Sequence, residues 1–310
     1  MIKRTLYFGN PAYLSTHLEQ LVVRLPEVEK NPTLPEAFKK EAQATIPIED
    51  VGVVILDHPQ IIISQALMAK LLNNNVAFIT CDNTHLPTGL MLNLSGHTLQ
   101  ASRFSDQINA SQPLLKQLWQ QTVKAKIKNQ ALLLQRHGIE AGNLMKWSRD
   151  VLSGDTENLE ARAATYYWKN LFPEVPNFKR EREGLPPNNL LNYAYAILRA
   201  IIARSLVGSG LLPTLGIHHH NQYNHYCLAD DVMEPYRPFA DALVKGLVAQ
   251  GGDYSQLSPD VKKKLLALAS VDVILNGERS PLMVAAQHTT ASLARCFGGN
   301  AKKIVYPELP

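Results

Sequence analysis

Residues 216–234 read "GIHHHNQYNHYCLADDVME" and gather side chains that bind metal ions or transfer protons. Four histidines, two aspartates and one glutamate fall within these nineteen positions, with no lysine or arginine among them. The stretch lies far from both ends of the chain, so a purification tag does not explain it. A metal site is one interpretation, and a polar loop is the ordinary alternative for any single histidine there.

Two kinds of metal site fit these residue types. A zinc site needs neutral imidazole or thiolate ligands in a tetrahedral array, and the stretch offers His218, His220, His225 and Cys227. Their spacing matches none of the regular zinc patterns. One imidazole with two carboxylates suits a hard divalent ion instead, Mg²⁺ or Mn²⁺. Such an ion polarises a phosphodiester and lowers the pKa of an attacking hydroxyl.

The acids of this stretch also have a structural explanation. Asp231 and Glu234 are three residues apart and would share one face of a helix. The pattern D-x-x-E is also a capping box, in which Asp231 is the N-cap and Glu234 folds back at N3. The capping box explains the acids but not the histidines beside them. Arg237, just after the acids, can hold a phosphate through two parallel hydrogen bonds.

A third acid, Glu160, lies in the segment "LEARAATYYW". Its neighbours on one helical face, at i+3, i+4 and i+7, are Ala163, Ala164 and Tyr167. A carboxylate among small residues points toward a close-packed neighbour, where it is costly without a cation. Glu160 therefore needs either a metal or a structural partner such as Arg199 or Arg204, and the arginine pairing is the more ordinary explanation.

The elements that must position these residues change in type along the chain. Five strands are predicted in the first hundred residues, at "RTLYFG", "LVVRLP", "VGVVILD", "VAFITCD" and "GLMLNL", with one helix opening on Ser64. Helices are predicted at 112–138, 156–172, 188–207, 231–250, 260–275 and 281–297, the fifth with Ser258 as N-cap and Pro259 at the first helical position. The fold class is therefore α+β, with a small strand-rich N-terminal domain (1–100) and a larger all-helical domain (101–310).

Charge and cysteine content narrow the class of protein. The net charge is +4, but the segment from Lys116 to Arg149 contains seven basic residues and one acidic residue, Glu140. This segment, with Lys124, Lys128 and Arg136, predicts a DNA-binding surface, and a solvated helix face is the alternative. Three scattered cysteines suggest a reducing compartment.

No membrane segment is expected. The start "MIKRTLYFGN" has no apolar core of a signal peptide, and Arg199 and Arg204 interrupt the most apolar stretch, "AYAILRAIIARSLVGSGLL". We therefore expect a cytoplasmic protein with a buried apolar helix.

These motifs resemble the CRISPR-associated adaptation integrase, the "Cas one" family of spacer acquisition. "LEARAATYYWKNLF" is similar to the family's E-x-x-A-A-x-x-Y helix, and "NNLLNYAYAIL" resembles its helix with Asn, Leu and spaced tyrosines. "GIHHHNQYNHYCLADDVMEPYRP" resembles its histidine loop followed by an acidic D-x-M-E-P helix. "FITCDNTHLPTGLML" is similar to the form that accompanies the type II effector nuclease. The matched segments spread from about residue 78 to residue 238.

The resemblance implies that the helical domain is catalytic and that Glu160 binds a metal. It also implies a histidine and an acid of the later motif as ligands. Relatives in the type II group place the histidine fifteen positions before the acid, which selects His219 and Glu234. Asp231 matches a further acid that contributes to the site in other branches.

At two points of this motif, neighbouring residues of the same type leave more than one match to the family's ligand. The triplet leaves His218 or His220 as alternatives to His219, although in an extended loop both would point away from the side that His219 faces. Asp230 is the alternative to Asp231.

The reaction implied is transesterification of DNA, in which a prespacer 3′-hydroxyl attacks a phosphodiester at the edge of a CRISPR repeat. Water in place of the hydroxyl gives endonuclease activity. The implied partners are the prespacer duplex and the repeat, a second copy in a homodimer, a small ferredoxin-like adaptation protein bridging two dimers, and the type II effector nuclease.

Two other classes fit the residues. A zinc-dependent small-molecule hydrolase would leave Glu160 idle, and a metal-free DNA-binding scaffold would leave the acids as caps.

Overall fold

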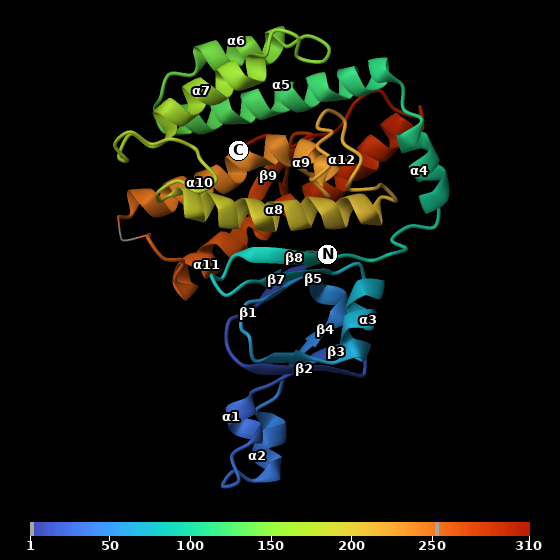
Figure 1. The fold of residues 1–310 in the computed structure, drawn as a ribbon, viewed down its shortest axis with the longest axis vertical. Helices are drawn as coiled ribbons and strands as arrows, with labels where there is room; N and C mark the ends of the chain where they lie inside the picture. Colours follow the sequence, from blue (N-terminus) through green and yellow to red (C-terminus); the bar gives the residue numbers. More distant parts are fainter. Residues whose placement is uncertain (1–2, 252–253) are drawn as a thin grey trace. The chain divides into compact units, whose positions relative to one another are not determined.

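The computed structural model describes residues 3–251 and 254–310, and the chain separates into two compact units, 1–96 and 97–310 (Figure 1). The sequence placed this boundary four residues later, after residue 100.

The N-terminal unit is built from two four-stranded sheets. Its strands are β1 (Arg4–Phe8), β2 (Ala12–His17), β3 (Gln20–Arg24), β4 (Ala44–Pro47), β5 (Val51–Leu56), β6 (Ile61–Ile63), β7 (Ala77–Cys81) and β8 (Pro87–Met91). Its helices are α1 (Pro26–Glu29), α2 (Glu36–Glu41), the 3₁₀ turn η1 (Ile48–Asp50) and α3 (Gln65–Asn73). One sheet has the order β1-β5-β7-β8, and the other has the order β4-β3-β2-β6.

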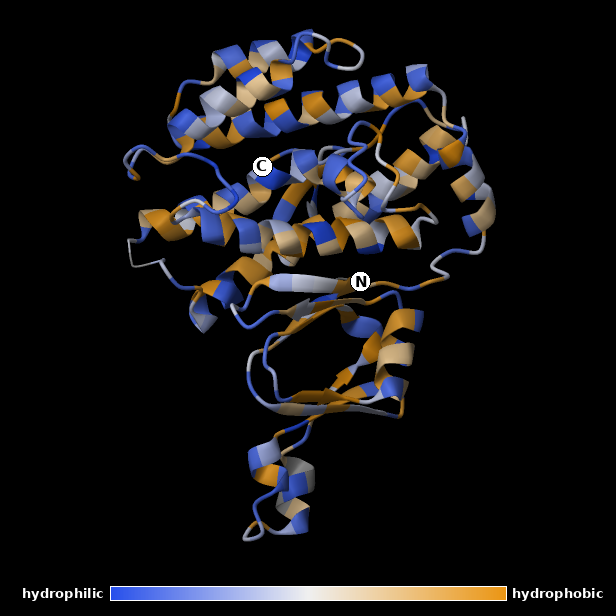
Figure 2. Cartoon of the chain, viewed as in Figure 1, coloured by the Kyte–Doolittle hydropathy of each residue, from blue (hydrophilic) through white to orange (hydrophobic). Residues whose placement is uncertain are grey.

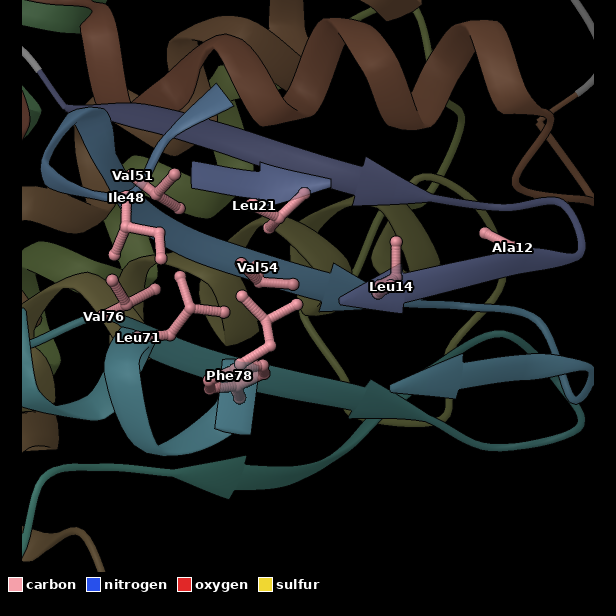
Figure 3. Close-up of a cluster of buried hydrophobic side chains, with 10 residues drawn as sticks. Ala12, Leu14, Leu21, Ile48, Val51, Val54, Leu71, Val76 and Phe78 are labelled. Atoms are coloured by element: carbon pink, nitrogen blue, oxygen red, sulfur yellow. The ribbon is translucent and has the colours of Figure 1, made fainter. Parts of the chain in front are cut away.

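Side chains from both sheets and from α3 fill a single core in this unit (Figure 3). β1, β5 and β7 run parallel, and the continuous apolar runs of β5 and β7 are nearly all buried, as expected for parallel strands covered on both faces. Ser64 caps α3 by accepting a hydrogen bond from the N–H of Leu67, which confirms the predicted helix start. Strands β2, β4 and β6 were not predicted, because polar residues or short length hide their pattern.

The C-terminal unit is mostly helical. Its helices are α4 (Gln100–Ile108), α5 (Gln112–Arg136), α6 (Gly142–Asp150), α7 (Leu159–Leu171), α8 (Asn188–Gly208), α9 (Cys227–Met233), α10 (Arg237–Ala249), α11 (Pro259–Leu266) and α12 (Leu282–Phe297). Two 3₁₀ turns, η2 (Glu234–Tyr236) and η3 (Ala267–Ser270), and two strands, β9 (Asp272–Leu275) and β10 (Glu278–Pro281), complete it. The predicted fold class, a strand-rich part followed by a mostly helical part, is confirmed.

Two long helices organise this unit. α8 packs against α9, α10 and α12, whereas α5 packs against α6, α7 and η2. In Figure 2, hydrophilic and hydrophobic residues are interspersed along α5, and its buried side includes polar residues such as Lys126 and Asn129. Within the described residues, α8 is the one helix long and apolar enough to cross a membrane, but 78% of its apolar window is buried inside the protein. α8 is therefore placed as a core helix, as predicted.

One predicted helix is partly wrong. The helix expected over 260–275 ends at Leu266, and a β-hairpin begins at Asp272, so the unit is not entirely helical. Asn276 and Gly277 join the two strands with φ of 53° and 86°, the backbone conformation of a type I′ turn. The Asn-Gly pair is a strong hairpin signal. At the other end of the helix, Ser258 accepts from the N–H of Val261, so the predicted cap is confirmed.

Candidate active site

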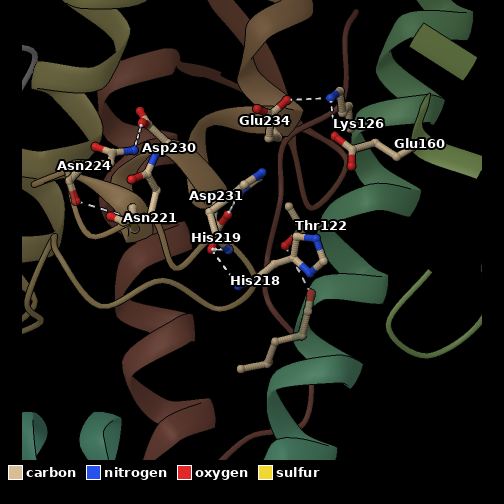
Figure 4. A network of polar contacts seen from close by, with 12 residues as sticks. Thr122, Lys126, Glu160, His218, His219, Asn221, Asn224, Asp230, Asp231 and Glu234 are labelled. Carbon is tan, nitrogen blue, oxygen red and sulfur yellow. Dashed lines mark hydrogen bonds and ion pairs between the residues drawn. The ribbon is translucent and has the colours of Figure 1, made fainter. Parts of the chain in front are cut away.

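Glu160, Glu234 and Lys126 meet in one cluster although they come from three separate elements (Figure 4). The Nζ of Lys126, on α5, lies 2.6 Å from Oε1 of Glu160, at the start of α7. The same nitrogen lies 2.6 Å from Oε2 of Glu234, the first residue of η2. Nη2 of Arg237 lies 2.9 Å from the other oxygen of Glu234. Two carboxylates distant in sequence thus converge on a single ammonium group.

The cluster is largely shielded from water. The exposed fraction of the side chain is 22% for Glu160, 11% for Lys126 and 7% for Glu234. Burial alone would raise the pKa of Glu234, but Arg237 and Lys126 outweigh it and hold that pKa below its ordinary value. Burial alone would lower the pKa of Lys126, but Glu234 and Glu160 reverse the effect and raise it. Lys126 and Glu234 are therefore both charged at neutral pH.

The structural partner predicted for Glu160 was wrong. The cation beside this carboxylate is Lys126, not Arg199 or Arg204. Arg199 instead holds Asp230, with Nε 2.7 Å from Oδ1 and Nη2 3.0 Å from Oδ2. Asp230 is thereby occupied by a structural ion pair.

Asp155 fixes the backbone that presents Glu160. Its carboxylate accepts hydrogen bonds from the N–H groups of Leu159 at 2.9 Å and Glu160 at 3.0 Å. The helix predicted from residue 156 therefore begins at Leu159. Residues 155–158 form a turn, and the carboxylate of Asp155 caps the first N–H groups of the helix.

Asn129 fixes the segment that presents Glu234. This side chain is fully buried on α5, and its Nδ2 donates to the carbonyl of Pro235 at 2.8 Å and to that of Pro307 at 3.0 Å. One amide thus ties η2 and the C-terminal tail to the helix that carries Lys126.

Asp231 organises the histidine loop, residues 216–226. It is fully buried on α9, and its Oδ1 pairs with Nδ1 of His219. Its Oδ2 accepts from the backbone N–H of His218 at 2.8 Å and of His219 at 3.4 Å. The hydrogen bond that its ring makes to the carboxylate of Asp231 raises the pKa of His219. Because the carboxylate holds Nδ1, Nε2 is the atom of His219 that can ligate a metal.

The loop closes tightly enough to require glycine at its first position. A Cβ on Gly216 would lie 2.3 Å from the carbonyl oxygen of His219 and 2.8 Å from Oδ2 of Asp231. A side chain at position 216 would therefore push His219 away from Asp231.

The expected alternation of the histidine triplet does not hold for His218. Its ring stacks on Trp119 with centroids 4.2 Å apart, while the ring of His219 meets the same indole edge-on at 5.6 Å. The backbone is curled around Asp231 rather than extended, so neighbouring side chains do not take opposite sides. Partial burial lowers the pKa of His218, the opposite of the shift at His219.

The capping-box explanation of the acids is wrong. The helix begins at Cys227, four residues before Asp231, so Asp231 lies inside a helix and bonds to the loop. Glu234 does not fold back to cap it, because its carboxylate contacts Lys126 and Arg237. Both acids are thus used in tertiary contacts.

Two of the candidate zinc ligands, Cys227 and His218, are engaged in separate contacts. The thiol of Cys227 is buried and donates to the carbonyl of Asn224 at 3.3 Å, while His218 stacks on Trp119. Within residues 3–251 and 254–310, no three His, Cys, Asp or Glu side chains gather at one point.

The donor chemistry of the cluster still fits a divalent ion. Two carboxylates already hold a cation, the ammonium of Lys126, between them. The negative charges of Glu234 and Glu160 add to the effect of Asp231 in raising the pKa of His219. Carboxylates with one neutral nitrogen are donors that suit Mg²⁺ or Mn²⁺.

The residues predicted to bind DNA lie in three places. Lys124 and Lys128 line a groove between α5, α6 and the C-terminal tail. The other basic residues of this groove are Arg149, Lys302 and Lys303. Lys128 is partly neutralised by Glu308 at 2.6 Å. Arg136 donates to the carbonyl of Pro310 at 2.8 Å, and Arg237 belongs to the acid cluster.

Sequence reasoning missed Lys126 as a member of the site. It was counted with the surface lysines of α5, yet it follows Trp119 by seven residues and Val123 by three, and so lies on the buried stripe of the helix. A lysine at a buried helical position would have been the signal, since lysine is rarely buried without a partner. Asn129 and Asp155 gave no comparable signal.

Comparisons with known proteins agree with the motifs. The family model described as CRISPR associated protein Cas1 matches residues 7–256. The CRISPR-associated endonuclease Cas1 of Neisseria meningitidis serogroup C (strain 8013) is 36% identical over 312 residues, covering 100% of this chain and 97% of the relative.

Two solved structures share the fold. A casposase bound to integration product matches with a TM-score of 0.75 at 18% identity, covering 98% of this chain and 93% of that chain. A Cas6-RT-Cas1–Cas2 complex matches with a TM-score of 0.73 at 20% identity, covering 100% of this chain and 36% of that chain. At these identities the likeness shows the fold alone. The family match and the relative that aligns along its whole length show that the chain belongs to the Cas1 family of CRISPR-associated endonucleases, as its motifs predicted.

Proposed function

We propose that this spacer-acquisition integrase joins and cleaves DNA with Mg²⁺ or Mn²⁺ as cofactor, and that Glu160, Glu234 and His219 are the residues that bind the ion. The observation that carries the proposal is the convergence of Glu160 and Glu234, from separate elements, on one cation. His219, oriented by Asp231, supplies the nitrogen donor.

The chemistry is an exchange of phosphodiester bonds. The oxygen of a DNA 3′-hydroxyl bonds to phosphorus in the target strand while the bond from that phosphorus to the target 3′-oxygen breaks. The attacking hydroxyl loses its proton and the released oxygen gains one, so no energy-rich cofactor is consumed. A divalent ion held by the three ligands would polarise the phosphodiester and favour ionisation of the attacking hydroxyl. Water as the attacking group gives cleavage instead.

Two further residues act around the ligands. Asp231 positions His219, because both of its oxygens are used to hold the imidazole and the loop backbone. This favours a positioning role over direct ligation by Asp231, and Asp230 is held by Arg199. Arg237 is 30% exposed beside Glu234, so its guanidinium can contact a DNA phosphate at the edge of the cluster.

The groove between α5, α6 and the C-terminal tail is the proposed path of a DNA backbone. It carries Lys124, Arg149, Lys302 and Lys303 against one acid, Glu308, among the residues that line it. Such an excess of positive charge attracts phosphates regardless of base sequence.

The assembly we propose follows the family. The solved Cas6-RT-Cas1–Cas2 complex and the casposase bound to integration product support a Cas2-type partner and DNA for this chain. The finer expectations are a homodimer, a small ferredoxin-like adaptation protein bridging two dimers, an association with the type II effector nuclease, and a place in the cytoplasm.

The test is strand transfer in vitro. A short duplex with free 3′-hydroxyls and a supercoiled plasmid carrying a CRISPR repeat are mixed with the purified chain and the small adaptation protein. We expect covalent joining with Mn²⁺ or Mg²⁺, none with EDTA, and less into a matched plasmid without the repeat. Joining that survives EDTA would overturn the proposal. Tight stoichiometric zinc would favour a hydrolase, and DNA binding without divalent-dependent chemistry would favour a scaffold.

A further inference from the structure

We propose that Lys126 is a displaceable counter-ion: its ammonium occupies the oxygens of Glu160 and Glu234 until a divalent ion takes its place, and it thereby weakens metal binding. The inference rests on the proposed function, because it takes these two acids as metal ligands.

The first support is competition for the same atoms. The Nζ of Lys126 lies 2.6 Å from Oε1 of Glu160 and 2.6 Å from Oε2 of Glu234. Figure 4 shows the ammonium between the two carboxylates. A divalent ion held by these two carboxylates would compete for the oxygens that the ammonium contacts, because its bonds to oxygen, about 2.0–2.1 Å long, leave no room for both cations. The remaining oxygen of Glu234 is held by Arg237 at 2.9 Å. The metal and the ammonium therefore cannot use these two oxygens together.

The second support is charge. The carboxylates of Glu160 and Glu234 are balanced by the cations of Lys126 and Arg237, so the four groups sum to zero. A divalent ion added beside a retained ammonium would create strong repulsion at contact distance in a mostly buried site. Release of the ammonium lowers that repulsion. Without any cation, the two carboxylates would repel each other, so Lys126 keeps the metal-free site assembled.

The third support is that only the side chain has to move. α5 is anchored beside the cluster by Asn129, which bonds to Pro235 and Pro307, and by Thr122, whose hydroxyl lies 2.9 Å from that of Tyr306. The four-carbon stem of lysine can swing its ammonium away without shifting the helix. An arginine at this position would bind the carboxylates through a rigid fork and be harder to displace.

The decisive variant is Lys126→Met, which keeps the stem length and removes the charge. Mn²⁺ binding is measured by titration calorimetry without DNA, next to wild type and Lys128→Met. The control loses the same charge from the same helix, but from the side chain that pairs with Glu308. We expect Lys126→Met to bind Mn²⁺ about tenfold more tightly or better, and to show a larger rise in melting temperature on adding Mn²⁺. Lys128→Met should match wild type.

Equal Mn²⁺ affinity in the two methionine variants, or weaker affinity in Lys126→Met, would overturn the inference. Failure of the proposed function looks different. In that case Glu160→Gln binds Mn²⁺ as wild type does, or wild type binds none. If Lys126→Met does not fold, wild type is acetylated with a lysine-specific reagent and analysed by mass spectrometry. Modification of Lys126, normalised to Lys128, should rise when Mn²⁺ is added, and an unchanged ratio contradicts displacement.

Discussion

Glu234 and Asp241 are two buried acids of the same unit, seven residues apart, yet the protein stabilises them in opposite ways. Glu234 is compensated by cations, Arg237 and Lys126, which hold its pKa low in spite of burial. Its partners carry full charge, and at least one of them, Lys126, sits on a flexible stem.

Asp241 is compensated by neutral hydroxyls. Tyr167 donates to Oδ2 at 2.8 Å and Tyr195 donates to Oδ1 at 2.6 Å, and all three side chains are buried. Burial raises the pKa of Asp241 to about 6, although the two tyrosines and Arg237 act against it. Hydroxyls fixed on rigid rings hold this carboxylate in one place and leave no room for exchange.

The difference separates a reactive acid from a structural one. α7 contributes to both sites, with Glu160 at its start and Tyr167 two turns later on the same side. A carboxylate held by exchangeable cations can pass to a metal, whereas one held by fixed hydroxyls joins helices. Similar burial thus serves two purposes, and the partners decide which.

The largest effect should come from neutralising the cluster. Glu160→Gln should lower divalent-dependent strand transfer by about a thousandfold or more, because loss of one metal ligand removes on the order of 4 kcal/mol of transition-state stabilisation. The matched control is Asp241→Asn, which neutralises an acid that bonds to the same helix. Single-turnover joining rates, corrected for the folded fraction by circular dichroism, give both numbers.

The assignment of a reactive role to the Glu160 site and a structural role to Asp241 is contradicted if Asp241→Asn loses as much activity as Glu160→Gln. It is also contradicted if Glu160→Gln melts far earlier but keeps its rate per folded molecule. In that case Glu160 would be a structural ion-pair partner of Lys126, whose loss costs about 3–5 kcal/mol of folding free energy.

The sequence predicted the helix faces and caps around this site, but it did not predict which side chains pair across it. Glu160 was found because helical spacing puts it on a face with small residues, which needs no knowledge of the neighbour. Its partner Lys126 lies 34 residues away on another helix, and no local pattern reports such a pairing. Ser64 and Ser258 were read correctly for the same reason, because a cap bonds within its own first turn.

The errors have a common physical cause. Asp231 matches a capping box, but tertiary bonds to His218 and His219 use its carboxylate instead. The hairpin around Asn276 and Gly277 was overlooked because the preceding lysine-rich segment fits a helical period and no strand pattern is long enough to oppose it. Where long-range contacts compete with local ones, the local pattern misleads.

The burial of Asp241 predicts that the stability of the protein depends on pH through this group. Its folded-state pKa is raised from 3.8 to about 6, so between these values the folded protein binds more protons than the unfolded chain. The stability contributed by this group is present below about pH 4 and is lost as pH rises through about 6. Because one pKa unit corresponds to about 1.36 kcal/mol, the total change is roughly 3 kcal/mol.

Urea unfolding of wild type and Asp241→Asn from pH 4 to pH 7.5 isolates this change, because other titrating groups cancel in the difference. The free energy of unfolding of wild type should fall relative to the variant as pH rises. A difference that is flat with pH would show that the tyrosine hydroxyls offset the burial of Asp241 completely.

The histidine loop should show a smaller and graded effect. His219→Ala should lower strand transfer by about a hundredfold or more, because it removes the proposed nitrogen ligand, and Asp231→Asn by about 10–100-fold, because a residue that orients a metal ligand contributes on that scale. His220→Ala should stay near wild type, and His218→Ala should cost stability through Trp119 more than activity. Rates at saturating Mn²⁺ and Mn²⁺ affinities are measured together. Comparable losses for all three histidines would point to a zinc cluster instead.

The smallest effect concerns Lys124 and Lys128, the lysines of α5 that line the groove. Like the two acids, the lysines of this helix differ in their partners, because Lys126 pairs with Glu160 and Glu234 whereas Lys128 pairs with Glu308. Each phosphate contact adds about −0.9 to the slope of log affinity against log salt. Lys124→Glu should therefore make the slope for any duplex shallower by about one unit. Lys128→Glu should change it less, because Glu308, 2.6 Å away, already neutralises part of its charge. Fluorescence anisotropy across a salt series measures both slopes, and Mn²⁺ affinity should be unchanged in each variant.

Equal changes of slope in the two variants would mean that DNA displaces Glu308 from Lys128. Two unchanged slopes would mean that this groove is merely solvated and that the DNA backbone runs elsewhere or on a partner protein.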